Sequence, residues 1–233
     1  MLQVHVVTAA NRTAYEDEME VFFQWRHRIY VEEKHWMPPK PTCLETDQYD
    51  TDDATYLLAF RDAEFVAGSR LRPFSTPTLL GEVFPHLVAK PMPSGPAEAE
   101  WTRMFVVPAA RGRSHRSVAG AMCCAVMEYC LDAGVSQLGG IQETYWLPRW
   151  TDFGWQVSPL GLPQDVNGQS CIAAMFDVTP KALSAARRAA GVEGNQILQF
   201  GPRRDFVTGP KQPRIPFQPP VGSTIDGLPK VLS

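Results

Sequence analysis

Charged and aromatic side chains gather between Arg26 and Asp50 in an arrangement that suits the binding of a polar ligand. An arginine and two aromatic residues come first, and three carboxylates follow within six residues: Arg26, Tyr30, Trp36, Glu45, Asp47 and Asp50. Ionised groups are costly to bury unless they are paired or bind a ligand. We therefore interpret this stretch as one half of an active site, and a segment carrying Glu100 and Arg103 as the other half.

The sequence carries no recognisable motif for an enzyme nucleophile. It holds no G-x-S-x-G pattern and no cysteine in a basic turn. Transfer of an acyl or other group would then be direct, between two substrates that the protein holds side by side.

Three of the candidate charges interrupt apolar strand patterns, namely Arg70, Glu100 and Arg103. Surface ion pairing, which contributes about 0–1 kcal/mol, is the alternative to a functional site. Residues three apart on a regular strand point to opposite faces. Glu100 and Arg103 therefore reach one site only if the strand bulges between them, as strands often do beside active sites. A regular ladder through 100–103 would remove one of the two from the site.

Composition and charge exclude several classes of protein. The net charge of −3 over 233 residues gives no general reason to expect a nucleic-acid or membrane partner. No apolar run approaches the roughly 20 residues that span a bilayer, and the N-terminus lacks the layout of a signal peptide, so a cytoplasmic protein is expected. The five cysteines form no C-x-x-C pair, and three of them lie in one apolar run as expected core thiols. His27 and His35 have no partners at metal-ligand spacing, so no metal is expected.

The elements that must position these side chains alternate between strands and helices. We expect helices over 14–31, 117–133, 144–152 and 179–190, with Asn11 capping the first and Pro148 breaking the third early. We expect strands over 3–7, 55–60, 65–72, 98–107, 136–141, 155–159 and 170–177, and a loop over 37–53. This order predicts one α/β domain with a mixed central sheet and helices on both faces.

The last part of the chain differs from the rest. Residues 201–233 hold seven prolines and show little periodicity. We expect a domain over 1–200 and an extended Pro-rich tail over 201–233 that wraps the surface or orders on a partner.

Four blocks of sequence, in a fixed order, carry a family resemblance. The first is an arginine with an aromatic residue four on and a tryptophan ten on, here Arg26, Tyr30 and Trp36. The second reads E-x-D-x-[YF]-D at 45–50, and the fourth reads E-x-[ST]-R-[MF]-x-V at 100–106. The third, at 68–73, departs from G-x-x-R-L by bringing Arg70 one residue sooner after the glycine. Together they resemble the LuxI-type acyl-homoserine-lactone synthases, the autoinducer synthases of bacterial quorum sensing.

The resemblance implies a fold, two substrates and a two-step reaction. The fold is an α-β-α sandwich similar to the acyl-CoA N-acyltransferases, with a V-shaped gap between two sheet strands for the thioester arm. S-adenosylmethionine is the amino donor and an acyl thioester is the acyl donor, with no prosthetic group. N-acylation comes first, and attack by the methionyl carboxylate then closes the lactone and expels methylthioadenosine.

Chemistry assigns roles to the residues of these blocks. An α-amino group with an ordinary pKa near ~8 needs only a modest base, and Glu100, directly or through water, is the candidate. Asp47 and Asp50 are expected to hold the ammonium or sulfonium, with Arg70 and Arg103 offsetting carboxylate charge. Backbone N–H groups near Met104–Val106 are expected to stabilise the oxyanion. Further S-adenosylmethionine contacts are expected from Arg26, Tyr30, Trp36, Phe105 and Val106.

The acyl half of the site is less sharply marked. Its expected lining comprises Met104, Ile141, Thr144, Trp146 and Met175, and the bulky aromatics favour a short, branched or aryl acyl group. Arg111, Arg113 and Arg116 form a basic turn that suits either an acidic acyl carrier protein or the phosphates of coenzyme A.

Two other readings remain open at the level of sequence. An ordinary acetyl-CoA-dependent N-acetyltransferase would share the fold but would not use the Arg26–Asp50 block. A non-catalytic ligand-binding module would have the Pro-rich tail as its working part.

Overall fold

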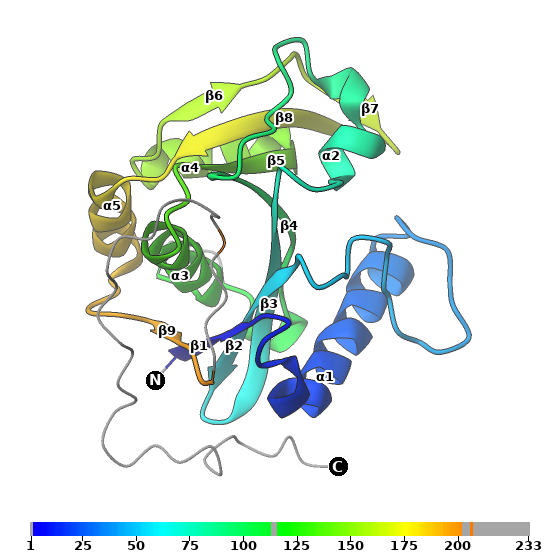
Figure 1. The fold of residues 1–233 in the computed structure, drawn as a ribbon, viewed down its shortest axis with the longest axis vertical. Coiled ribbons are helices and arrows are strands. Elements are labelled where there is room, and N and C mark those ends of the chain that lie inside the picture. The colour runs from blue at the N-terminus through cyan, green and yellow to red at the C-terminus, as the bar shows by residue number, and fades with distance from the viewer. Residues whose placement is uncertain (1, 113–115, 202–205, 207–233) are drawn as a thin grey trace.

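A mixed β-sheet runs through the computed structural model, which describes residues 2–112, 116–201 and 206 (Figure 1). Its strands are β1 (Leu2–Val7), β2 (Thr55–Arg61), β3 (Glu64–Pro73), β4 (Glu98–Val106), β5 (Gln137–Glu143), β6 (Val157–Pro159), β7 (Gln164–Val166), β8 (Gln169–Asp177) and β9 (Ile197–Leu198). The order across the sheet is β6-β8-β5-β4-β3-β2-β1-β9, with β7 beside β8. The seven predicted strands are confirmed; β7 and β9 are too short to show a sequence pattern.

Helices cover both faces of the sheet. They are α1 (Glu16–Arg26), α2 (Leu79–Glu82), α3 (Val118–Asp132), α4 (Leu147–Asp152) and α5 (Pro180–Ala190). A 3₁₀ turn precedes α1, and the same helix continues as π-helical backbone over His27–Glu33. In Figure 1, α3 and α5 lie on one side of the sheet and α1 on the other. No helix among the described residues is long and apolar enough to cross a bilayer.

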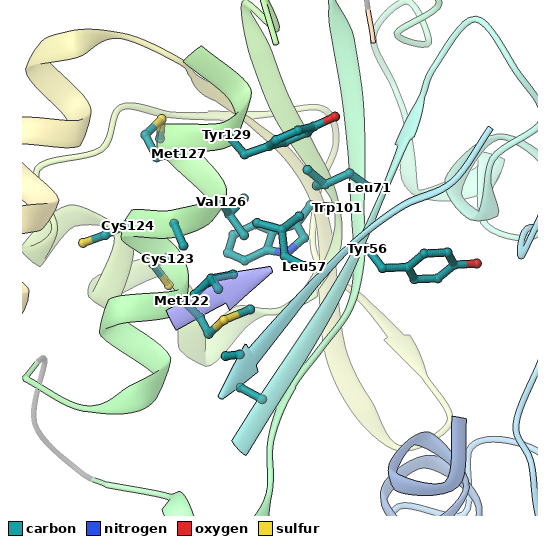
Figure 2. Close-up of a cluster of buried hydrophobic side chains, with 14 of the residues drawn as sticks. Tyr56, Leu57, Leu71, Trp101, Met122, Cys123, Cys124, Val126, Met127 and Tyr129 are labelled. Carbon is teal, nitrogen blue, oxygen red and sulfur yellow. The ribbon is translucent and has the colours of Figure 1, made fainter. Parts of the chain in front are cut away.

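Strand side chains that do not pack against α3 point to the opposite face of the sheet, where α1 lies. In Figure 2, Leu57, Leu71 and Trp101 lie toward α3, whereas Tyr56 points away from it. Side chains alternate along a strand, and Tyr56 is paired with Arg70. Arg70 therefore faces α1. Figure 2 also shows Cys123 and Cys124 on α3; these two and Cys130 are buried free thiols, as expected.

Strands β4 and β5 separate part-way along their length. They pair in parallel only from Glu98↔Gln137 to Glu100↔Gly139, although β4 continues to Val106 and β5 to Glu143. This is the V-shaped gap that the resemblance implies. Gly140 lies beside the point of separation with a φ of +143°, a conformation that L side chains rarely adopt.

Two local predictions are wrong. Asn11 does not cap the first helix: its Oδ1 accepts the Thr8 N–H, and its amide donates to the carbonyls of Val6 and Phe200. Its side chain fastens the end of β1 instead. Pro148 does not break a helix but lies in the first turn of α4, where a missing N–H removes no helical hydrogen bond.

Candidate active site

Three arginines and three carboxylates form a buried ionic network on the α1 face of the sheet. Arg26 comes from the end of α1, Arg70 from β3 and Arg103 from β4, and the loop before β2 supplies Glu45, Asp47 and Asp50. No side chain in the network is more than 10% exposed. Buried ionised groups are stable only when paired, and here three positive charges meet three negative ones.

Arginine–carboxylate contacts hold the loop against the sheet. Arg70 Nη1 lies 2.6 Å from Asp47 Oδ1 and 2.8 Å from Asp50 Oδ1. Arg26 donates to Glu45 and, at 2.8 Å, to Asp50 Oδ1. Burial alone would raise the pKa of Asp50, but the guanidinium groups of Arg26 and Arg70 outweigh it and hold that pKa well below its ordinary range.

The two aspartates are less available to a ligand than the sequence suggests. Asp50 Oδ1 accepts from two arginines and from Tyr56 Oη, and its Oδ2 accepts the Asp47 N–H. Asp47 Oδ1 accepts from Arg70 and the Tyr49 N–H, and its Oδ2 accepts from Arg70 and Arg103. Because all four oxygens already accept hydrogen bonds, the structure gives these carboxylates the role of fastening the loop. Asp47 still contributes to the wall of the adjoining cavity.

The predicted bulge in β4 is confirmed. The pairing of β3 with β4 shifts between Gly68 and Arg70, and Arg103 has a φ of +53°. The extra residue keeps Arg103 on the same face as Thr102, whose Oγ1 accepts from Arg70 Nε at 3.2 Å. Arg103 Nε and Nη2 donate to the network, whereas its Nη1 has no hydrogen-bond partner among the described residues. That nitrogen belongs to a residue of the cavity wall and can bind an anionic group.

Glu100 lies on this same face of β4 and is completely buried. One carboxylate oxygen accepts the Leu79 N–H at 3.0 Å and the other accepts the Leu80 N–H at 2.6 Å, at the start of α2. Burial raises the pKa of Glu100, although these two N–H groups and the guanidinium groups of Arg70 and Arg72 act in the opposite direction. Glu100 is not among the residues that line the cavity. A path for a proton would have to pass through an intervening group or water.

Tyr30 and Trp36 form an aromatic pair at the other end of the bulge. Their rings stack with centroids 5.7 Å apart, and Lys34 Nζ lies 4.2 Å from the centre of the Trp36 ring. The Tyr30 hydroxyl donates to the Met104 carbonyl at 3.1 Å, and its ring lies 5.3 Å from the Arg103 guanidinium. The Tyr30 hydroxyl thus ties the π-helical end of the first helix to the bulge.

A cavity of about 860 Å³ follows the gap between β4 and β5. One part is lined by Tyr30, Trp36, Asp47, Arg103 and α2, and another by the β5 residues 139–143 and by Trp101, Trp146 and Trp150. Residues from both faces of the sheet therefore border one space. Such a cavity can hold two substrates that meet at the edge of β4.

The structure brings most, but not all, of the expected binding residues to this cavity. Met104, Ile141, Trp146, Phe105 and Val106 line it, although most of Phe105 is buried against Phe22. Thr144 and Met175 are not among the lining residues. Met175 is buried in a second apolar cluster with Phe74 and Leu80, because its position on β8 directs it to that face.

Two of the three basic residues of the expected carrier contact, Arg111 and Arg116, lie in the described part of the chain. Arg111 borders the cavity and makes a two-bonded ion pair with Glu33, at 2.8 and 2.9 Å. Arg116 is exposed and lies beside Gly191, after the end of α5. Arg113 lies outside the described residues.

Sequence reasoning missed several residues of the site. Trp150 lines the cavity and donates through Nε1 to Gln142, also a lining residue. Lys34 bridges to Glu143 at 3.2 Å and so joins the end of the first helix to β5. These pairs are 8 and 109 residues apart in sequence, and no local pattern marks them.

Comparison with known proteins identifies the family. The profile of the autoinducer synthases matches residues 10–185. The chain belongs to the autoinducer synthase family. The family prediction made from the four sequence blocks is confirmed.

Relatives of this autoinducer synthase agree with that assignment. Isovaleryl-homoserine lactone synthase from Bradyrhizobium diazoefficiens is 41% identical over 206 residues, which are 88% of this chain and 92% of that protein. The solved structure of BjaI, a CoA-dependent acyl-homoserine lactone synthase with SAM and isopentyl-CoA, is 40% identical. It matches 88% of this chain and 97% of BjaI, with a TM-score of 0.83.

The fold prediction is confirmed as well. An acyl-CoA N-acyltransferase from Pseudomonas aeruginosa is only 17% identical but matches 75% of this chain and 99% of its own, with a TM-score of 0.51. The autoinducer synthase thus shares its α/β sandwich with the wider N-acyltransferases.

Proposed function

We propose that this autoinducer synthase makes an N-acyl-L-homoserine lactone from S-adenosylmethionine and an acyl-CoA. The observation that carries the proposal is the cavity that follows the β4–β5 gap. One part of its wall contains the Arg103 bulge and the Tyr30–Trp36 pair, and another part is apolar and aromatic. A charged amine donor fits the first environment and an acyl chain fits the second. The CoA-dependent relative supports the choice of donor.

The first step forms an amide. The α-ammonium of S-adenosylmethionine loses a proton, its nitrogen attacks the thioester carbonyl, and the C–S bond breaks to release the thiol. We propose that Arg103 Nη1 binds the methionyl carboxylate and that the Trp36 ring lies beside the purine or the sulfonium, since both residues line the cavity. Backbone N–H groups at Met104–Val106, in the part of β4 that is not paired with β5, are the proposed oxyanion donors.

The second step closes the lactone. A carboxylate oxygen attacks the carbon attached to the sulfonium, the C–S bond breaks, and methylthioadenosine leaves as a neutral thioether. Because the sulfonium is already a good leaving group, the protein mainly has to hold the chain in a bent conformation. We propose that Glu100 accepts the proton of the first step through water, since burial raises its pKa toward the range useful at neutral pH.

One experiment tests this proposal against an ordinary acetyltransferase and against a binding module. The purified full-length protein is incubated with S-adenosylmethionine and either isovaleryl-CoA or isovaleryl-acyl carrier protein, and the products are measured by mass spectrometry. We expect equal amounts of lactone and methylthioadenosine, with the CoA thioester preferred. Thiol release without methylthioadenosine would indicate an ordinary acyltransferase, and no turnover with either donor would refute an enzymatic role.

A further inference from the structure

The acyl part of the cavity is bordered by Trp146 and Trp150, which belong to a stack of three tryptophans. Trp150 lies between Trp146 and Trp155, with ring centroids 5.2 Å away on each side and interplanar angles of 14° and 8°. Trp101 and Phe176 approach the same ring at 5.7 and 5.4 Å. Strands β4 and β8, the turn before α4 and the segment between α4 and β6 therefore all contact one side chain of α4.

This wall is fixed in place rather than adaptable. Trp150 is 5% exposed and donates to Gln142 Oε1. Trp101 is 9% exposed and donates to Ser69 Oγ at 2.5 Å. A ring that is stacked on both faces and hydrogen-bonded at its edge cannot swing aside without losing those contacts. A longer acyl chain cannot make room for itself by moving these rings.

The backbone of β5 forms another side of this part of the cavity and is packed without spare room. Gly139 and Gly140 of β5 border the cavity next to Trp101, at the point where β4 and β5 separate. A Cβ at Gly139 would lie 2.1 Å from the Ala174 carbonyl oxygen, and one at Gly140 would lie 3.3 Å from the Trp101 carbonyl oxygen. No side chain can be added at Gly139 without moving the backbone. The β5 backbone is therefore a second fixed wall of this part of the cavity.

We propose that these fixed walls select a short acyl group and that Trp146 is the residue that limits its length. The inference rests on the proposed synthase function and adds the class of acyl donor. The acyl chain lies along the β5 backbone, and its end meets the indole stack. Trp146 is the half-buried outer ring of the stack, so it can be replaced with less damage to the core than Trp150 or Trp155.

The test compares isovaleryl-CoA with octanoyl-CoA as donors, using methylthioadenosine release to obtain kcat/KM for the wild type and for Trp146→Leu. Trp25→Leu is the matched control. Trp25 is also half-buried and also has an arginine at 4.8 Å from its ring, but it lies on α1 and is not a lining residue.

We expect the wild type and Trp25→Leu to prefer isovaleryl-CoA by about tenfold or more, as pocket discrimination by methylene groups allows. Trp146→Leu is expected to lower that preference by about tenfold, chiefly by gaining activity with octanoyl-CoA, while the KM for S-adenosylmethionine stays the same. A wild type that prefers octanoyl-CoA, or an unchanged preference in Trp146→Leu, would overturn the inference. Absence of methylthioadenosine with every thioester would instead refute the proposed function on which it depends.

Discussion

Arg70 is the member of the ionic network whose removal should be most informative. It donates to Asp47 at 2.6 and 3.1 Å, to Asp50 at 2.8 Å and to Thr102 at 3.2 Å. Arg70→Met keeps the apolar volume but leaves the buried network with one negative charge in excess. Because that charge cannot reach water, we expect the free energy of unfolding to fall by about 3–5 kcal/mol.

The charge balance can be restored without restoring the contacts. Asp50→Asn alone leaves an excess positive charge and is also expected to be destabilising. The double variant Arg70→Met/Asp50→Asn returns the network to two charges of each sign. It should therefore lose less stability than the sum of the single variants, with a coupling energy of about 2–3 kcal/mol.

Urea unfolding at pH 7 measures these energies, with the midpoint and slope determined for each variant. Arg72→Met is the control. Arg72 is equally buried on β3, but it donates to neutral groups of Tyr49, Thr51 and Pro77, and its nearest carboxylate is the exposed Asp53 at 4.0 Å. Asp50→Asn should not rescue this control. Strict additivity of Arg70→Met and Asp50→Asn would refute the argument from charge balance.

Three further predictions concern separate parts of the protein. Glu100→Gln should lower kcat far more than it changes either KM if Glu100 is the base, whereas equal effects on kcat and KM would leave it only the role of anchoring α2. Burial lowers the pKa of His5 from 6.5 to about 4, so the unfolded chain binds the proton first as pH falls. Stability should be fully present above about pH 6.5 and fall by roughly 1.4 kcal/mol per unit down to about pH 4; His5→Phe should lack this slope in thermal unfolding curves. Thr179→Ala removes the side chain that caps α5 by accepting the Ala182 N–H at 3.0 Å, and it should cost about 1 kcal/mol of stability without altering kcat. A loss of activity in that variant under native conditions would contradict the separation of α5 from the site.

Local chemistry made much of this fold predictable. The helix α5 has a threonine cap, a proline in its first turn and a glycine with a φ of +63° after its end, and the structure places its boundaries where those signals lie. The bulge in β4 was also predictable, because Glu100 and Arg103 could face one side of the sheet only with an extra residue between them. By contrast, the role of Asn11 depends on Phe200, which is 189 residues away.

The block from Arg26 to Asp50 shows where sequence reasoning stopped. Residue types and spacing predicted a site here and identified the autoinducer synthase family. Residue types and spacing did not determine which charged groups are available to a ligand, because their availability depends on the arginines that β3 and β4 contribute. Once Arg26, Arg70 and Arg103 converge, the oxygens of Asp47 and Asp50 are taken up in fastening the loop.

The sequence by itself therefore determined the fold class, the family and the residues that carry charge. Only the tertiary structure decided that Arg103 keeps one nitrogen for the cavity, that Glu100 is turned toward α2, and that stacked tryptophans border the acyl side. The physical reason is that hydrogen-bond capacity and packing space are shared among neighbours. Which neighbours compete for them is set by contacts between elements far apart in the chain.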